Sequence, residues 1–175
     1  MRRILLSCAL LGVLTLPTAA VARSSAPAKP GYLVVQKAAG DGGVNGRPVV
    51  TLVVRGFVLG RVSQEARVAV YYLPSKNAGG TPQVQQGADV STSARRWHGL
   101  PGRVFSGSNF RFRAMGGFYR VVVRGSGVYL FAGGHGHVTF RGSSVNKRAD
   151  GRYSVNGGTF RSLPEEPVQK KIGGG

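Results

Sequence analysis

The chain has 175 residues, with 24 lysines and arginines against 6 aspartates and glutamates, 28 glycines and one cysteine. This length suits a single domain with an ordinary hydrophobic core, and one cysteine excludes a disulfide-stapled scaffold. A formal net charge of +18 excludes a neutral surface and indicates that the chain attracts polyanions.

The first 22 residues have the three parts of a secretory signal. Arg2 and Arg3 form a charged start, residues 4–16 form an apolar run, and residues 20–22 (Ala-Val-Ala) form a cleavage site. The apolar run is shorter than the roughly 20 residues of a membrane-spanning helix, so we expect cleavage and no transmembrane anchor. The exported protein then has 153 residues with 22 basic and 6 acidic side chains, and we expect it in the envelope or the extracellular space.

Residues 23–30 are rich in Pro, Ala and Ser, which predicts a flexible linker. Short apolar runs then alternate with glycine and polar turn signals, which is the pattern of β-strands. The predicted strands of this first unit, residues 31–73, are 31–38, 48–55, 57–62 and 66–73.

Residues 74–108 are rich in Gly, Ser, Thr and Gln and are predicted to form a long loop. Such loops are unusual inside a compact domain, so we expect parts of it to cover the core or to form short edge strands. The cluster Arg95-Arg96-Trp97-His98 interrupts it. Trp97 is a candidate aromatic contact for a sugar ring or a base, although a lone loop tryptophan more often folds back onto a core, and we favour that interpretation.

The rest of the chain repeats the strand pattern more strictly. Phe110, Phe112 and Ala114 fall on one face of a predicted strand, with Arg111 and Arg113 on the other. We interpret the glycine clusters that follow as tight turns, because glycine tolerates positive φ. The predicted strands of this second unit, residues 109–163, are 109–114, 118–124, 128–132, 137–141, 152–155 and 159–163, and residues 164–175 are predicted to be a disordered tail.

The two units share a short internal echo. The sequence Val-Val-Arg-Gly occurs at 53–56 and again at 122–125, and similar strands follow both copies. We interpret this as a duplicated supersecondary unit, with chance similarity as the alternative. No segment of the exported protein has a helical period or a capped helix start. The sequence therefore predicts an all-β fold: a single-domain antiparallel β-sandwich or barrel built from two related units about a pseudo-two-fold axis.

Two motifs in the second unit resemble a group of secreted bacterial proteins. Residues 111–121 contain R-F-R-x-x-G-G-x-Y-R-V, and residues 152–157 read R-Y-S-V-N-G. Over residues 109–163 the chain is similar to uncharacterised secreted bacterial all-β proteins. The resemblance implies a secreted all-β protein and brings no activity or functional residues with it.

The arginines are the main candidate for a binding function. Arginine suits bidentate contact with phosphate, sulfate or carboxylate, and residues two apart on a strand share a face. The predicted polyanion-binding residues are Arg111, Arg113, Arg120, Arg124, Arg141 and Arg152. They indicate an anionic polysaccharide or wall polymer as the partner, without specific nucleic-acid recognition. The alternative is that these arginines only solubilise strand faces and protect sheet edges.

His135-Gly136-His137 is the one metal-like motif, since two histidines at i and i+2 of a strand share a face. Metal-binding cupins place a glutamate four or five residues further on, where this chain has Arg141 and Gly142. We therefore prefer two surface histidines and predict neither a metal nor a cofactor.

Catalytic signals are sparse. Two of the six acidic residues precede glycine in turns and two lie in the tail, which leaves Glu65 in a hairpin tip and Asp89 in a loop. No nucleophile, phosphate-loop or dinucleotide motif is present. We predict a non-catalytic protein that binds anionic polymer. The alternatives are an envelope assembly protein that acts through protein–protein contacts and a cell-wall glycan hydrolase that uses this carboxylate pair.

Overall fold

The computed structural model describes residues 28–40, 43–73, 82–85, 90–143 and 150–174, and these residues form strands, connections and one short 3-10 turn. The fold is all-β, as the sequence predicts. No helix among the described residues is long and apolar enough to cross a membrane. The predicted signal, 1–22, and most of the linker, 23–30, lie outside the described residues.

The strands form one antiparallel sheet that does not close into a barrel. Its order is β10-β9-β1-β8-β2-β7-β3-β6-β5, with β11 added to β8 and β4 added to β7. The strands are β1 (Gly31–Ala38), β2 (Val50–Val62), β3 (Ala66–Leu73), β4 (Gln83–Gln85), β5 (Ser91–Trp97), β6 (Leu100–Gly107), β7 (Phe110–Gly125), β8 (Val128–Phe140), β9 (Arg152–Val155), β10 (Arg161–Ser162) and β11 (Val168–Ile172), and the turn η1 (Gly43–Asn45) lies between β1 and β2.

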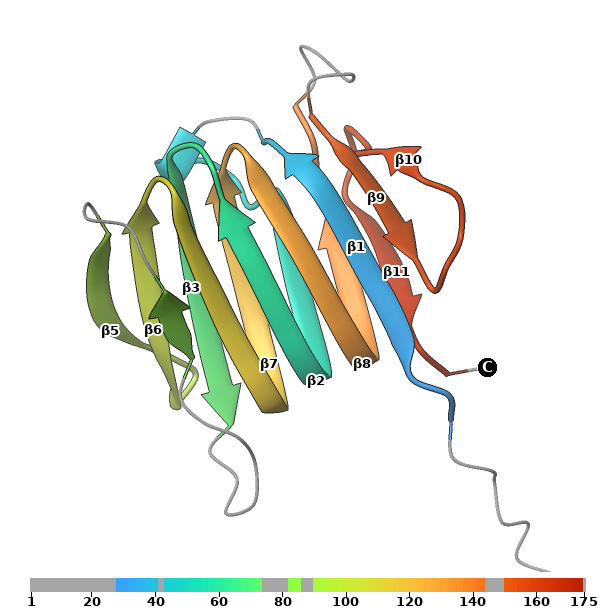
Figure 1. Ribbon diagram of the computed structural model, residues 1–175, viewed down its shortest axis with the longest axis horizontal. Coiled ribbons are helices and arrows are strands. Elements are labelled where there is room, and N and C mark those ends of the chain that lie inside the picture. Colours follow the sequence, from blue (N-terminus) through green and yellow to red (C-terminus); the bar gives the residue numbers. More distant parts are fainter. Residues whose placement is uncertain (1–27, 41–42, 74–81, 86–89, 144–149, 175) are drawn as a thin grey trace, which may run out of the picture.

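Three long strands, β2, β7 and β8, bend together along a row of glycines. Gly56 of β2 pairs with Gly117 of β7 and with Gly134 of β8. Gly56 and Gly134 have φ values of 152° and 136°, which favour glycine, and a Cβ at Gly56 would collide with the carbonyl oxygen of Gly133. The sheet folds over itself at this row and forms two layers (Figure 1).

The bend divides the strands between the layers. The first layer contains β4, β1, β9 and β10 with residues 110–114 of β7, 58–62 of β2 and 128–134 of β8. The second layer contains β5, β6, β3 and β11 with residues 50–56 of β2, 118–125 of β7 and 136–140 of β8. Each layer therefore has an inner face and an outer face.

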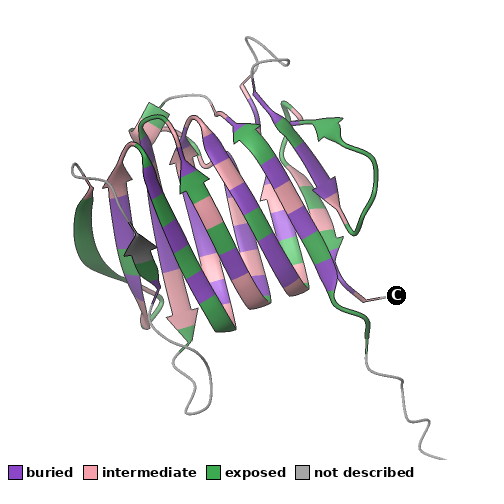
Figure 2. Ribbon diagram, viewed as in Figure 1, coloured by how far each residue is buried: buried purple, intermediate pink, exposed green. Residues whose placement is uncertain are grey.

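The inner faces of the two layers enclose the core. Buried and exposed residues alternate along the strands, as half-buried strands require (Figure 2). Phe110, Phe112 and Ala114 are buried as predicted, with Arg111 and Arg113 exposed. An irregularity beside Gly56 then shifts the alternation of β7, so that the next residues it contributes to the main core are Tyr119, Val121 and Val123.

The interpretation of the glycine clusters as turns is wrong at 116–117 and at 133–136, and the predicted break between strands 48–55 and 57–62 at Gly56 is wrong as well. Residues 56, 116–117 and 133–136 lie inside β2, β7 and β8, whose pairing continues on both sides of them. Glycine permits a bend within a strand as readily as a turn between strands, and local sequence does not distinguish these uses. The Gly-Ser-Gly at 125–127 does form a turn, since it joins β7 to β8.

The predicted two-unit repeat is not confirmed. The first Val-Val-Arg-Gly, at 53–56, lies in the middle of β2 and ends at the bend. The second, at 122–125, lies at the end of β7 and leads into a hairpin. The two copies therefore occupy different positions in the fold.

Two segments predicted to lack structure contain strands. In the predicted loop 74–108, β6 pairs with β3, and β5 forms an edge of the sheet, in keeping with the expected edge strands. In the predicted tail 164–175, the expectation of disorder is wrong, because β11 pairs with residues 136–140 of β8 and buries Ile172. That part of β8 is available because β1 pairs only with residues 128–134.

Candidate functional site

The outer face of the second layer brings together arginines from separate parts of the sequence. Arg67 of β3 pairs directly with Arg124 of β7, and four residues along the same strands Tyr71 pairs with Arg120. Arg95 of β5 pairs with Gly102 of β6 in the neighbouring ladder. Strand pairing therefore converts scattered arginines into one basic surface.

A hollow of about 390 Å³ lies at the centre of this surface. Among the described residues, its lining contains four arginines and no acidic residue. We call it the arginine groove, and its lining residues are Val44, Asn45, Arg67, Ala69, Tyr71, Arg95, Arg96, Val104 and Arg124. Two of the lining residues, Ala69 and Val104, form a small apolar cluster with Val122, and Tyr71 packs against this cluster.

The central arginines of the groove are held close together. Arg67 and Arg124 are half-buried cross-strand partners, and Arg124 Nε donates to the carbonyl oxygen of Gly46 at 2.9 Å. Like charges directly opposite one another destabilise a sheet. An anion bound between the two guanidinium groups would offset this repulsion with charge-assisted hydrogen bonds.

Trp97 fixes another arginine at the margin of the groove. The Arg120 guanidinium carbon lies 4.0 Å from the centre of the Trp97 ring, a favourable cation–π geometry. Tyr71 and His98 contact the same ring, at centroid distances of 6.1 and 4.5 Å. Trp97 therefore packs on an outer face and not on the core as we favoured, and Arg120 occupies the ring that was the candidate aromatic contact.

The predicted polyanion-binding arginines do not form one surface. Arg120 and Arg124 belong to the face just described, but Arg111 and Arg113 lie on the outer face of the first layer. Arg152 lies on β9 opposite Gln36. Arg141 follows the end of β8, where its backbone N–H donates to the carbonyl of Val49.

The sequence analysis missed Arg67, Arg95 and Arg96 as site residues. The alternation of residues 66–70 is visible in the sequence, and it puts Arg67 on the opposite face from the buried Val68 and Val70. However, no local sequence pattern shows that β3 lies between β6 and β7, and this pairing gives Arg67 its arginine neighbours.

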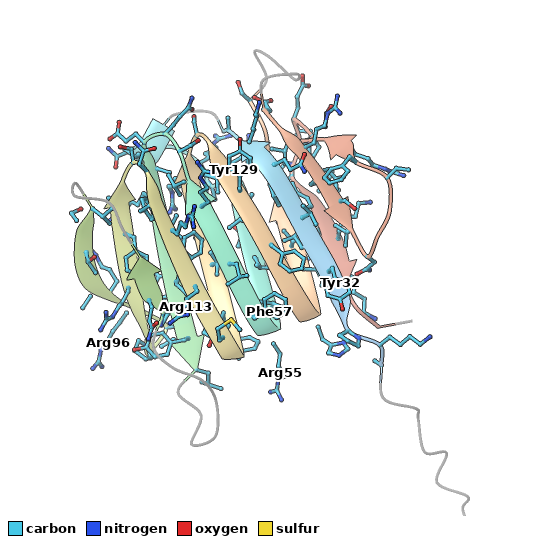
Figure 3. All side chains as sticks on the ribbon, viewed as in Figure 1. Tyr32, Arg55, Phe57, Arg96, Arg113 and Tyr129 are labelled. Atoms are coloured by element: carbon cyan, nitrogen blue, oxygen red, sulfur yellow. The ribbon has the colours of Figure 1, made fainter. Side chains whose placement is uncertain are left out.

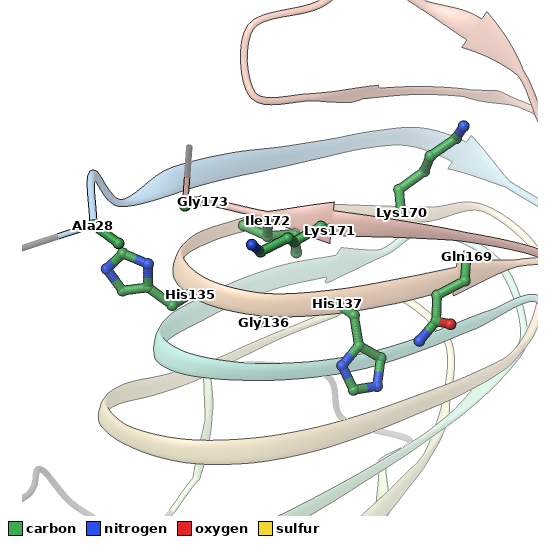
Figure 4. Close-up of a pocket in the computed structure, with 10 residues that line it drawn as sticks. Ala28, His135, Gly136, His137, Gln169, Lys170, Lys171, Ile172 and Gly173 are labelled. Carbon is green, nitrogen blue, oxygen red and sulfur yellow. The ribbon is translucent and has the colours of Figure 1, made fainter. Parts of the chain in front are cut away.

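His135 and His137 extend the basic character of this face. Both side chains are exposed, and they lie opposite Arg55 and Val53 of β2, with Lys171 of β11 on the other side of His137. His135, His137 and Lys171 border a depression of about 700 Å³ (Figure 4). Among the described residues no group of three His, Cys, Asp or Glu side chains is placed to hold a metal ion.

The described residues do not bring the proposed carboxylate pair, Glu65 and Asp89, together. Glu65 is exposed between β2 and β3, and Asp89 lies outside the described residues. Comparison of the chain with protein-family models, with curated proteins and with solved structures found no match. The functional argument therefore rests on the residues themselves.

Proposed function

We propose that this protein is a secreted, non-catalytic β module that binds an anionic polysaccharide or wall polymer in the arginine groove. The observation that carries the proposal is the convergence of Arg67, Arg95, Arg96 and Arg124 around one hollow, whose described lining residues include no acid. Guanidinium groups form paired hydrogen bonds with sulfate, phosphate and carboxylate groups, which are the charged groups of such polymers.

An extended ligand fits this face better than a small isolated anion. A cross-strand row continues beyond the groove from Arg120 through Val53 and His137 to Lys171, so it has a cation at each end. Neighbouring strands are about 4.8 Å apart, so a polymer lying across them meets a new side chain at each strand. Arg120 lies over the Trp97 ring, so that side of the ring is not open to base stacking.

Calorimetric titration with heparin, used as a sulfated polysaccharide probe, tests the proposal across a series of salt concentrations. We expect affinity to fall steeply as salt rises, because mobile ions screen charged groups beyond about 8–10 Å at physiological ionic strength. Arg67→Gln with Arg96→Gln should weaken binding at least tenfold. The control is Arg152→Gln with Arg161→Gln, which removes the same charge from exposed positions on β9 and β10. An equal loss in both double variants would contradict a localised site.

A second candidate function is assembly through a sheet edge. β5 ends the strand order, and six of its seven residues are exposed. An unpaired edge is a template for another strand, although arginines on it oppose pairing with a second copy. Sedimentation over a wide concentration range tests assembly: a rise in mass that Ser93→Pro abolishes would support it, and a constant monomer mass would contradict it.

A further inference from the structure

The outer face of the first layer carries a cluster of exposed aromatic and aliphatic side chains. Tyr32, Phe131 and Leu59 are 50%, 39% and 39% exposed, and Phe57 is half-buried beside them. The Tyr32 and Phe131 rings are parallel within 4° at a centroid distance of 6.1 Å, and Phe57 lies 5.4 Å from Phe131. Exposed apolar groups that gather in one patch mark binding surfaces, whereas scattered ones do not.

Strand pairing builds this patch. Gly133 of β8 lies between Phe57 of β2 and Tyr32 of β1 in one cross-strand row. A Cβ at Gly133 would meet the Phe57 ring at 2.5 Å, so the ring extends over the glycine. Figure 3 looks onto this layer and labels Tyr32, Phe57 and Tyr129 on its neighbouring strands. We call the surface of Tyr32, Phe57, Leu59, Tyr129 and Phe131 the aromatic face.

A hollow of about 380 Å³ adjoins the aromatic rings, and its lining includes Val34, Gln36, Leu59, Arg61, Arg111 and Phe131. A volume of this size is within the range of small-ligand sites. Arg61 and Arg111 are direct cross-strand partners, and both are exposed. The hollow therefore joins an apolar wall to a pair of like charges that an anionic group would stabilise.

A third arginine extends the charged side of this hollow. Arg113 Nε and Nη2 donate to Oε1 of Gln83 at 2.9 and 2.6 Å, which holds the side chain along the sheet surface. In its cross-strand row, Arg113 is followed by Leu59, Phe131 and Val34 on three successive strands. One row thus passes from a cation to an aromatic ring and an aliphatic side chain.

We propose that the aromatic face binds a chain of acidic pyranose sugars lying across the strands. The strand spacing of about 4.8 Å is close to the length of one pyranose unit, so successive sugars meet successive strands. The C–H groups of a pyranose face carry partial positive charge and pack on the negative faces of Tyr32 and Phe131. Sugar carboxylates then reach Arg61 and Arg111.

An anionic bilayer is the competing occupant, and the geometry disfavours it. Aromatic residues that insert into a bilayer must project beyond the surrounding backbone, whereas these side chains lie on the strands of a sheet layer and Phe57 is half-buried. The hollow also includes Gln36, whose amide suits a hydroxyl-bearing ligand better than hydrocarbon.

The test measures binding of a galacturonic acid hexamer by titration calorimetry in the Arg67→Gln, Arg96→Gln protein, so that the arginine groove contributes little. We expect binding there, and we expect at least a tenfold loss on adding Tyr32→Ala with Phe131→Ala. The matched control is Phe160→Ala, which removes an aromatic ring that is 47% exposed on the connection between β9 and β10. Arg61→Gln with Arg111→Gln should weaken binding similarly without altering the rings.

Four outcomes would overturn the proposal. The first two are that the Arg67→Gln, Arg96→Gln protein (the groove variant) does not bind the hexamer, or that its binding is unchanged after loss of the two rings. The third is that neutral cellohexaose binds equally well. The fourth is that the protein binds phosphatidylglycerol vesicles in a ring-dependent way but does not bind the hexamer. Thermal melting of each variant establishes that it is folded. The aromatic face is independent of the proposed function: loss of heparin binding in the groove variant with retained hexamer binding would support both sites separately.

Discussion

The outer faces of the two layers each carry a pair of arginines directly opposite one another, but the surroundings of the two pairs differ. Arg67 and Arg124 are half-buried, and a backbone carbonyl holds Arg124. Arg61 and Arg111 are exposed beside aromatic rings. We therefore expect the groups around each arginine pair, more than the number of arginines, to determine the ligand. The clustered arginines of the groove suit the charged groups of a polymer. The arginines beside aromatic rings suit acidic sugar units.

The largest effect is expected from breaking the bend that creates both faces. Gly56→Val places a branched side chain at a φ of 152° against the carbonyl oxygen of Gly133. We expect the free energy of unfolding to fall by about 3 kcal/mol or more, measured by urea denaturation. Gly157→Val is the control, since Gly157 also has positive φ but has open space around it. Equal losses in the two variants would show that the bend does not depend on close approach at Gly56.

A smaller effect is expected from removing the aromatic support of the groove. Trp97→Leu leaves every arginine in place but removes the ring below Arg120. Because cation–π contacts are worth about 0.5–2 kcal/mol, we expect heparin affinity to fall about three- to tenfold in calorimetry. Binding of the galacturonic acid hexamer to the aromatic face, measured with Trp97→Leu added to the Arg67→Gln, Arg96→Gln protein, should not change. A parallel loss of hexamer binding would mean that the two faces are not separate sites.

The smallest effect is on the free energy of unfolding, and it should differ between the two arginine pairs because one pair is half-buried and the other is exposed. Arg67→Gln relieves a like-charge contact in half-buried surroundings, so we expect the free energy of unfolding without ligand to rise by about 0.2–1 kcal/mol. Arg61→Gln relieves an exposed contact and should change stability less, because solvent already screens it. Urea denaturation at low salt measures both. A loss of stability in Arg67→Gln would indicate that the pair is not under electrostatic strain.

Local pattern predicted much of the fold but not the assembly of its surfaces. The alternation around Phe112 correctly assigns the buried and exposed residues of the first half of β7. The glycines at 56, 117 and 134 were not recognised as a bend, because their alignment depends on which strands pair. The sequence alone predicts disorder for the short run at 168–172. Its strand depends on a free edge of β8, and that edge is visible only once the whole sheet is assembled.

The same limit applies to the candidate sites. The sequence analysis correctly emphasised arginine, but it grouped Arg111 with Arg120 because they are close in sequence. The bend between them puts the two side chains on different layers. Conversely, Arg67 and Arg124 are far apart in sequence and directly opposed in the sheet. The aromatic face has the same origin, since Tyr32, Phe57 and Phe131 come from three strands.

Trp97 is the only tryptophan of the chain and lies beside the arginine groove. Its fluorescence therefore reports directly on whether an anionic polymer binds in the groove. The measurement is a titration of the purified protein with heparin at low and high salt, followed by tryptophan emission. We predict a saturable change in emission that high salt and Arg67→Gln with Arg96→Gln remove, and that Tyr32→Ala with Phe131→Ala leaves intact. Heparin binding with unchanged Trp97 emission, or an emission change that survives loss of the groove arginines, would contradict the account.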